Sequence, residues 1–358
     1  MRYNVCLKRT LQGFKKTTPH WNIYLDAIEG FVSESKFDIE LRSRRSLPLC
    51  TPLLSQDTTF KVGQNTKFGR RVSATPLYTT RIPPKLRYDL FLKNELAHTL
   101  HPIRQIVRVF LATYKSLSPR FDKLFSTAAT PEDVENIYEE TIVSVKKFLS
   151  FVTEFTKLVY PPPTLDDSSE EKSTQADFID RMINQKICDF IFMETTSPVY
   201  SYAFRCLELK KSVELSNFKR LLQDYSHKTL QEIDEQLPDK FLLRGWNEPY
   251  RNVAEGISLQ KDIANPFTKK EIFTTMEDRI RNTIIAYYLS QGREVPHFIA
   301  EPDQKISIYI YALIQSKHER VILDLSFIDE FTGREEDNQS YILFNSCVEF
   351  LTNGKFRL

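Results

Sequence analysis

The sequence contains few residue patterns that could carry out covalent chemistry. It has no glycine-rich nucleotide loop, no Gly-x-Ser-x-Gly turn, no His-Glu-x-x-His helix and no Cys-x-x-Cys pair. These are the patterns that place a phosphate, a nucleophile or a metal ion. His98 and His101 would share one helix face, but no cysteine or further histidine lies near them in the sequence, so a structural role is favoured over a metal site. We therefore expect a protein that binds a partner, with no enzymatic reaction and no cofactor.

Two further positions have a recognisable chemical context. Ser73 follows Arg70-Arg71-Val72, the form that basophilic kinases phosphorylate, so Ser73 is a candidate regulatory site where a phosphate would reduce the local positive charge. Asp303 follows Pro302 and precedes the apolar segment 306–314. On local grounds alone this position is typical of a helix N-cap, because an aspartate accepts hydrogen bonds from the first free backbone N–H groups.

Charge is distributed unevenly along the chain. Residues 1–90 hold 16 Lys and Arg against 7 Asp and Glu, a net of +9, whereas the remainder holds 33 against 40, a net of −7. Such asymmetry is typical of a basic arm beside an acidic domain. Residues 1–85 are therefore expected to form an irregular basic arm or small module that contacts anionic lipid at a membrane surface. Aromatic residues do not interleave with the basic clusters as in nucleic-acid-binding modules, so no nucleic-acid partner is expected.

The cysteines and the absence of long apolar runs indicate the compartment. The five cysteines are far apart, which is more typical of buried reduced thiols than of a disulfide framework. No stretch of about 18 apolar residues occurs, and the first residues lack the apolar core of a signal peptide. We expect a cytoplasmic protein that reaches a membrane only by peripheral recruitment.

Helical periodicity begins near residue 86. Apolar residues recur at three- and four-residue spacings up to residue 160 and predict a small helical bundle over residues 86–160. Thr130 followed by Pro131-Glu132-Asp133 predicts a helix start, with threonine as the cap and proline in the first turn. Residues 161–176 (PPPTLDDSSEEKSTQA) are rich in proline, acids and serine, a composition that buries little apolar surface. They are the expected linker.

Residues 177–358 are expected to form a second, all-helical domain. Apolar stripes at helical spacing run through 178–191 and 272–288, and residues 207–225 are helical in character. Three apolar blocks follow, at 306–314, 323–331 and 341–351. The first is rich in isoleucine and tyrosine and is also compatible with a strand, but the flanking helices favour a buried helix. The predicted fold class is therefore mainly α.

The last three blocks carry a family resemblance. They contain PDQKISIYIYALI at 302–314, LSFIDEF at 325–331 and SYILFNSCVEFL at 340–351. In this order they resemble the signature helices of the Vps-nine domain family, the guanine-nucleotide exchange factors for Rab-five subfamily GTPases of endosomes. Segments 178–192, 207–218 and 266–285 resemble the preceding family helices in spacing, and the bundle at 86–160 lies where several members carry a supporting bundle. The resemblance implies a layered helical exchange domain, a Rab-five-type GTPase as partner, and recruitment to early endosomes.

The resemblance also implies roles for particular residues. Asp303 would be the acidic residue that enters the nucleotide site of the GTPase, and Tyr341 would contact its switch surface; a core tyrosine is the alternative for Tyr341. Four further residues are expected to bind the GTPase, namely Ile306, Ser307, Phe344 and Asn345.

Five positions depart from the family pattern, namely Pro302 for a small residue, Lys305 for an apolar residue, Ser307 for proline, Ser340 for glycine and Phe344 for threonine. The alternative function is a helical scaffold or adaptor that binds a GTPase or another trafficking protein without exchange.

Overall fold

The structure, a computed structural model, is all-helical throughout the part of the chain that it describes. The described residues are 2–14, 19–33, 84–97, 101–128, 130–161, 169–193, 195–246, 248–295, 302–333 and 339–352, and no strand occurs among them. The prediction of a mainly α fold is confirmed for these residues. No helix in them is long and apolar enough to cross a membrane.

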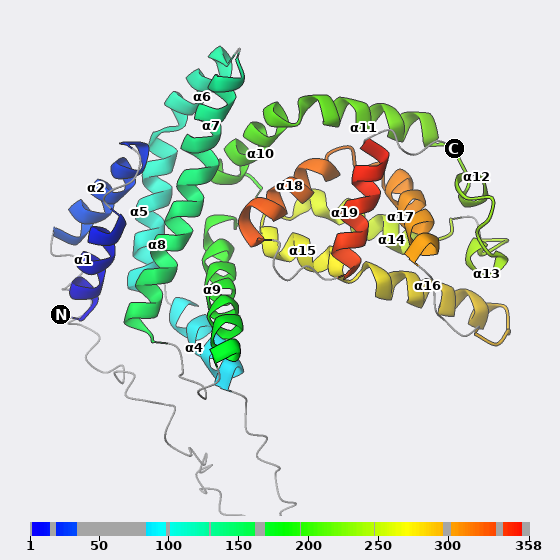
Figure 1. Cartoon of the computed structure of the whole chain (residues 1–358), viewed down its shortest axis with the longest axis horizontal. Helices are drawn as coiled ribbons and strands as arrows, with labels where there is room; N and C mark the ends of the chain where they lie inside the picture. The colour runs from blue at the N-terminus through cyan, green and yellow to red at the C-terminus, as the bar shows by residue number, and fades with distance from the viewer. Residues whose placement is uncertain are drawn as a thin grey trace, which may run out of the picture.

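The N-terminal helices form a bundle, which lies on the left in Figure 1. In this bundle α1 packs against α8, α2 against α5, and α8 against α9. The elements are α1 (Arg2–Phe14), α2 (Pro19–Ser33), α4 (Pro84–Ala97), α5 (Pro102–Ser116), α6 (Ser118–Thr127), α7 (Pro131–Tyr138), the π-helical turn η1 (Glu139–Val143), α8 (Ser144–Val159) and α9 (Ser169–Ile191).

The first two helices correct the expectation of an irregular segment at residues 1–85. Helices α1 and α2 lie inside that range, and their apolar side chains belong to the bundle core. Leu7 and Leu11 on α1 are four residues apart, as are Tyr24 and Ile28 on α2, and all four are buried. This spacing aligns them on one helix face. The expectation was wrong for these two helices because it rested on the prolines and arginines of residues 42–84, which follow them in the sequence.

Local capping sets where the bundle helices begin. Thr130 accepts a hydrogen bond from the backbone N–H of Asp133, whose carboxylate accepts one from the Thr130 N–H, and Pro131 follows the cap. This reciprocal arrangement satisfies two otherwise unpaired donors, and the predicted helix start is confirmed. His101 caps α5, since its Nδ1 accepts from the Ile103 N–H and its Nε2 bonds to the Tyr160 hydroxyl. The structural role expected for His101 is therefore observed; His98 lies outside the described residues.

Aromatic rings fill the bundle core. Phe110 of α5 and Phe148 of α8 stack with centroids 3.9 Å apart, and Tyr24 of α2 stacks on Tyr114 at 6.4 Å. The hydroxyl oxygens of Tyr24 and Tyr114 are buried without a hydrogen-bond partner among the described residues. An unpaired buried hydroxyl carries a desolvation cost that no hydrogen bond offsets.

Replacing Tyr114 with phenylalanine is therefore expected to leave stability unchanged or to raise it by up to about 1 kcal/mol. The matched control is Tyr250→Phe, because the equally buried Tyr250 hydroxyl donates to the Phe241 carbonyl at 2.7 Å. That change should lower the free energy of unfolding by about 1–2 kcal/mol. Urea denaturation of both variants measures the difference, and a larger loss for Tyr114→Phe would contradict the assignment.

Helix α9 begins inside the expected linker. It starts at Ser169, so residues 169–176 are helical and the expectation of an unstructured connection was wrong for them. The sequence places Glu170 and Glu171 directly after this start. Acidic residues there favour a helix because they complement the positive end of its dipole. The composition that suggested a linker is thus also compatible with a polar first turn.

The C-terminal helices form the second group, on the right in Figure 1, where α11 runs over the top of α18 and α19. Helix α17 packs against both α14 and α19, and α15 against α18 and α19. The elements are α10 (Pro198–Lys210), α11 (Ser212–Tyr225), α12 (Leu230–Ile233), α13 (Asp239–Leu242), α14 (Arg251–Ser258), the 3-10 turn η2 (Leu259–Asp262), α15 (Pro266–Thr274), α16 (Met276–Ser290), α17 (Pro302–Ser316), α18 (Val321–Thr332) and α19 (Gln339–Thr352).

The expected helices of this part are confirmed, with two breaks that periodicity did not predict. The segment 207–225 divides at Lys211 between α10 and α11, and the stripe at 272–288 divides at Thr275 between α15 and α16. The blocks at 306–314, 323–331 and 341–351 lie in α17, α18 and α19. The strand that remained open for the first block does not form. Of the three helices named by the resemblance, α17 packs directly against α19, and α15 packs against both α18 and α19.

Candidate functional site

The first turns of α17 and α19 are joined through one carboxylate. Lys305 of α17 contacts Glu277 of α16, with Nζ 2.6 Å from Oε1. Ser340 of α19 donates from Oγ to the other oxygen of the same carboxylate, Oε2, at 3.2 Å. The hydrogen bond from Lys305 is the main cause that lowers the pKa of Glu277 below its usual value. Three helices therefore meet at an ionised carboxylate, beside the positions where Asp303 and Tyr341 were predicted to act.

Asp303 is the second residue of α17. It is therefore in the first helical turn, two positions before Lys305 in the chain. The N-cap interpretation would place it just before the helix, whereas the helix begins at Pro302. Its role in nucleotide release stays a prediction.

Ser307 ties α17 to a third segment. Its hydroxyl donates to Asp234 Oδ2 at 2.7 Å, and the other oxygen of that carboxylate accepts the backbone N–H of Gln236 at 3.0 Å. Asp234 directly follows α12. A proline at position 307, as in the family pattern, could not make this bond. Ser307 is half-buried, and its hydroxyl is already used within the chain because it donates to Asp234. Its predicted contact with a GTPase stays a prediction.

Tyr341 and Phe344 are part of the protein core. Tyr341 is 0% exposed and its hydroxyl donates to Asp329 Oδ1 of α18 at 2.8 Å. The Lys270 ammonium lies 5.2 Å from its ring centroid. Phe344 is equally buried, 4.6 Å from the Phe273 ring. The core alternative stated for Tyr341 is thus what the structure shows, and contact of either ring with a partner would require α19 to move.

The remaining predicted residues lie partly at the surface. Ile306 and Asn345 are half-buried, and the Ile306 carbonyl lies 4.0 Å from Cys347 Sγ, where α17 and α19 touch. Ile342 was not singled out in the sequence, yet it is 51% exposed and directly follows Tyr341. The exposure of this large aliphatic side chain beside a predicted binding residue marks Ile342 as a candidate contact that the sequence pattern did not reveal. Ile342 and Asn345 are three residues apart, so they share an outward face of α19.

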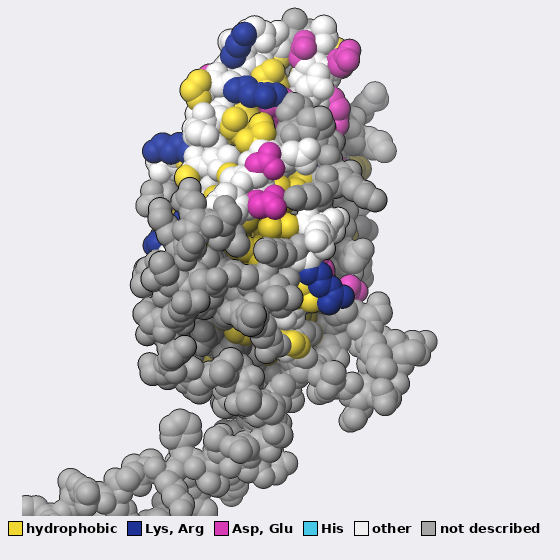
Figure 2. Space-filling view, turned by 90° about the vertical axis from the view of Figure 1, so that its left-hand side faces the viewer, with side chains coloured by type: hydrophobic (Ala, Val, Ile, Leu, Met, Phe, Trp, Pro, Cys, Tyr) yellow, Lys and Arg dark blue, Asp and Glu magenta, His cyan; other side chains and the backbone are white. Residues whose placement is uncertain are grey.

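Ser73 and the basic clusters of residues 42–45 and 67–71 lie outside the described residues. Their proposed regulation and lipid contact stay predictions. On the described part of the face in Figure 2, dark blue and magenta side chains are scattered among yellow ones and do not form a patch of one sign.

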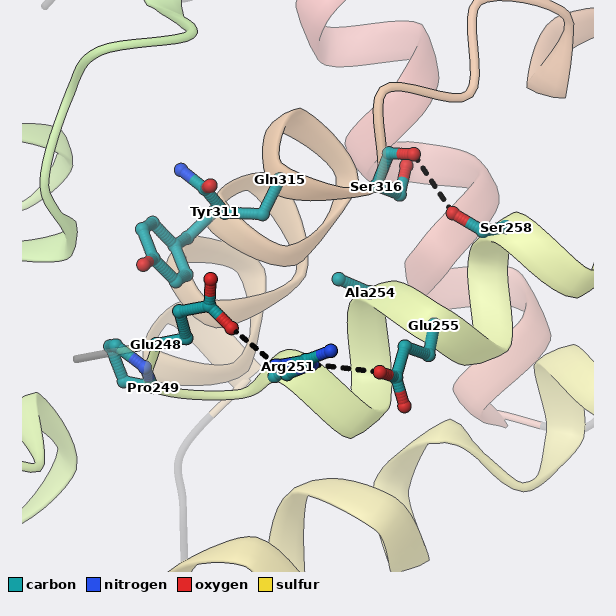
Figure 3. A pocket seen from close by; sticks show the side chains of 9 residues that line it. All are labelled: Glu248, Pro249, Arg251, Ala254, Glu255, Ser258, Tyr311, Gln315 and Ser316. Atoms are coloured by element: carbon teal, nitrogen blue, oxygen red, sulfur yellow. Dashed lines mark hydrogen bonds and ion pairs between the residues drawn. The ribbon is translucent and has the colours of Figure 1, made fainter. Parts of the chain in front are cut away.

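A small hollow opens between α14 and the C-terminal half of α17 (Figure 3). Its volume is about 230 Å³. The Arg251 guanidinium lies in it and donates to Glu248 at 2.9 Å and to Glu255 at 2.8 Å. All three groups are well exposed, so these ion pairs are weak. The hollow contains none of the predicted site residues, because those lie on the first turns of α17 and on α19.

A buried ionic cluster lies between α15 and α18. Lys269 Nζ is 2.6 Å from Asp324 Oδ1 and also donates to the Gln260 carbonyl. His318 Nε2 bonds to the other oxygen of Asp324, Oδ2. Burial lowers the pKa of Lys269, and the Asp324 charge opposes that shift. Lys269, Asp324 and His318 are at most 2% exposed, so the cluster has no access to a substrate and its role is structural.

Cys188, Cys206 and Cys347 are buried and form no disulfide. Burial raises the pKa of the Cys206 thiol to about 11 and that of Cys347 to about 12, and it also raises the pKa of Cys188. These thiols are therefore protonated and poor nucleophiles near neutral pH. Within the described ranges, no group of three or more His, Cys, Asp or Glu side chains is placed to hold a metal ion.

Comparison with known proteins identified no relative of this chain. We found no matching family model, no matching curated protein and no matching solved structure. The geometry of the helices α16 to α19 therefore carries the functional argument.

Proposed function

We propose that the C-terminal helices bind a small GTPase of the Rab-five subfamily and accelerate its release of GDP, with Asp303 as the working carboxylate. The observation that carries the proposal is the junction at Glu277, which joins the first turns of α17 and α19. The two segments with predicted contact residues are distant in sequence, and this side chain joins their first turns in addition to the direct packing of α17 against α19. Exchange would take place in the cytoplasm at early endosomes.

The proposed mechanism needs no covalent step. A GTPase holds its nucleotide through Mg²⁺ and a lysine that contacts the phosphates. A carboxylate brought into that site pairs with the lysine, repels the phosphates and disfavours the metal ion. These interactions are strong where water is excluded. The nucleotide-free GTPase is stabilised, so GDP leaves faster.

Four of the five departures from the family pattern make contacts of their own within the chain. Lys305 and Ser340 share Glu277, and Ser307 bonds to Asp234. Phe344, in place of the family's threonine, packs against Phe273 in the core. Each of these four side chains thus helps to fix α17 or α19.

The test is GDP release from a panel of purified GTPases loaded with fluorescent GDP. We expect the full chain to accelerate release from a Rab-five-type member, and Asp303→Ala to reduce the acceleration at least about tenfold, equivalent to a loss of about 1.4 kcal/mol of transition-state stabilisation. Asp239→Ala is the matched control, since Asp239 is a well-exposed carboxylate on α13. No acceleration with any GTPase, or an unchanged rate for Asp303→Ala, would overturn the proposal.

Binding without exchange is the second candidate, and the burial of Tyr341 favours it. The Tyr341 hydroxyl is already bonded to Asp329, so it is not presented to a partner. A scaffold of this kind would bind the GDP-bound, GTP-bound and nucleotide-free forms of a GTPase with similar affinity. Preference for the nucleotide-free form in the same panel would instead support exchange.

A further inference from the structure

Helix α18 packs into both parts of the protein. Leu323, Phe327 and Phe331 belong to the hydrophobic cluster that includes the N-terminal bundle. Val321, Leu325 and Ile328 belong to the cluster of the C-terminal helices. In Figure 1, α18 lies between α10 and α19. A helix buried on two sides transmits a change in one packing surface to the other, because a close-packed interior deforms little.

Glu330 of α18 is held by two bundle residues. Its Oε2 accepts a hydrogen bond from the Tyr138 hydroxyl at 2.8 Å and lies 2.9 Å from Lys146 Nζ. Lys210 of α10 covers the Tyr138 ring, with Nζ 3.5 Å from the centroid. Glu330 is 23% exposed, so this contact is partly shielded from solvent. Charge-assisted hydrogen bonds of this kind are stronger than neutral ones.

The preceding residue, Asp329, holds α19. It accepts the hydroxyl hydrogen bond of Tyr341 at 2.8 Å. Consecutive helical residues project about 100° apart, so Asp329 and Glu330 reach different neighbours from one turn of α18. The bundle and the first turn of α19 are thereby linked through two adjacent carboxylates.

We infer that Glu330 is a positioning residue through which the N-terminal bundle sets the placement of α19. The Tyr138 and Lys146 contacts fix the rotation of α18, and Asp329 passes that rotation to Tyr341. The consequence for GTPase binding rests on the proposed function, because α19 bears one of the predicted contact segments. The mechanical link does not rest on it.

The test is amide hydrogen exchange of the full chain carrying Lys146→Met. We expect exchange in the first turns of α19 to rise about threefold to tenfold, in line with the loss of a charge-assisted hydrogen bond. Lys157→Met is the matched control, because Lys157 lies on the same helix α8 and pairs with Asp180 at 3.0 Å, away from α18. It should leave α19 unchanged. An unchanged α19 in Lys146→Met would overturn the inference.

A double-mutant cycle separates positioning from general loosening. Tyr341→Phe removes the bond to Asp329 and should itself raise exchange in α19. In that background, Lys146→Met should add little, because the link through Asp329 is already cut. Fully additive effects would show that Lys146 acts by another route and would overturn the inference.

Nucleotide release provides the functional readout. Lys146→Met should slow the accelerated GDP release severalfold while Lys157→Met does not. If the wild-type chain accelerates no GTPase but Lys146→Met still loosens α19, the proposed function fails and the link stands. If GDP release is accelerated and α19 is unaffected by Lys146→Met, the link fails and the function stands.

Discussion

Replacing Asp324 with alanine is expected to lower the free energy of unfolding by about 3–5 kcal/mol, because it leaves a buried lysine without its counter-charge. Lys269 is 0% exposed, and its Nζ lies 2.6 Å from Asp324 Oδ1. His318 also loses the acceptor for its Nε2. Chemical denaturation measures the loss. A loss below about 1 kcal/mol would show that the charges are compensated elsewhere.

Two comparisons test the cause of this loss. Asp239→Ala removes a carboxylate that is exposed and paired with Arg244, so it should change stability by less than about 1 kcal/mol. Lys269→Met combined with Asp324→Leu should cost less than Asp324→Ala alone, since no unpaired charge remains in the interior. If the double variant is the less stable one, the lost packing outweighs the electrostatic effect.

The pH dependence of Asp324→Ala has a definite sign. Burial already lowers the pKa of Lys269 below 10.5, and the Asp324 charge counteracts this. Without Asp324 the folded-state pKa falls further while the unfolded-state value does not. Between these two values the unfolded chain binds a proton that the native protein does not. The variant should therefore regain stability as pH rises toward about 10.5.

The second large effect is expected for Phe327→Ala, at about 3–5 kcal/mol. Phe327 is 0% exposed, and its ring centroid lies 5.0–5.4 Å from four other rings. These belong to Phe192, Tyr200, Phe204 and Phe331. Truncation removes buried apolar area and leaves a cavity that cannot easily collapse, because the surrounding rings come from α10, α18 and the residue that follows α9. Phe350→Ala is the control, because Phe350 is 41% exposed, and it should cost less than about 1 kcal/mol.

The two tryptophans allow this loss to be followed in each part of the protein. Trp21 lies in the bundle core, and Trp246 packs against the C-terminal cluster. Variants that keep only one tryptophan report the two clusters separately. Because α18 contributes to both clusters, Phe327→Ala should shift the denaturation midpoint seen by both tryptophans. A shift confined to one of them would contradict the role of α18 as a shared element.

The sequence by itself determined the helical class and most helix positions. Thr130 with Pro131 and Asp133 defined a helix start because a capping box depends only on neighbouring residues. The apolar blocks of α17, α18 and α19 were recognisable because helical periodicity is also local. Local composition was also misleading, since it assigned residues 2–33 to an irregular arm and 169–176 to a linker.

The tertiary structure decided which side chains meet and which are exposed. Tyr341 and Phe344 lie in the core, whereas Ile342, which stands between them in the sequence, is exposed on the surface of α19. Glu277 contacts both Lys305 and Ser340, which come from two other helices. Asp324 pairs with Lys269, 55 positions away, and Glu330 with Tyr138, 192 positions away. Such partners depend on how helices pack and rotate against one another. A one-dimensional pattern specifies the apolar face of a helix but not the element that covers it.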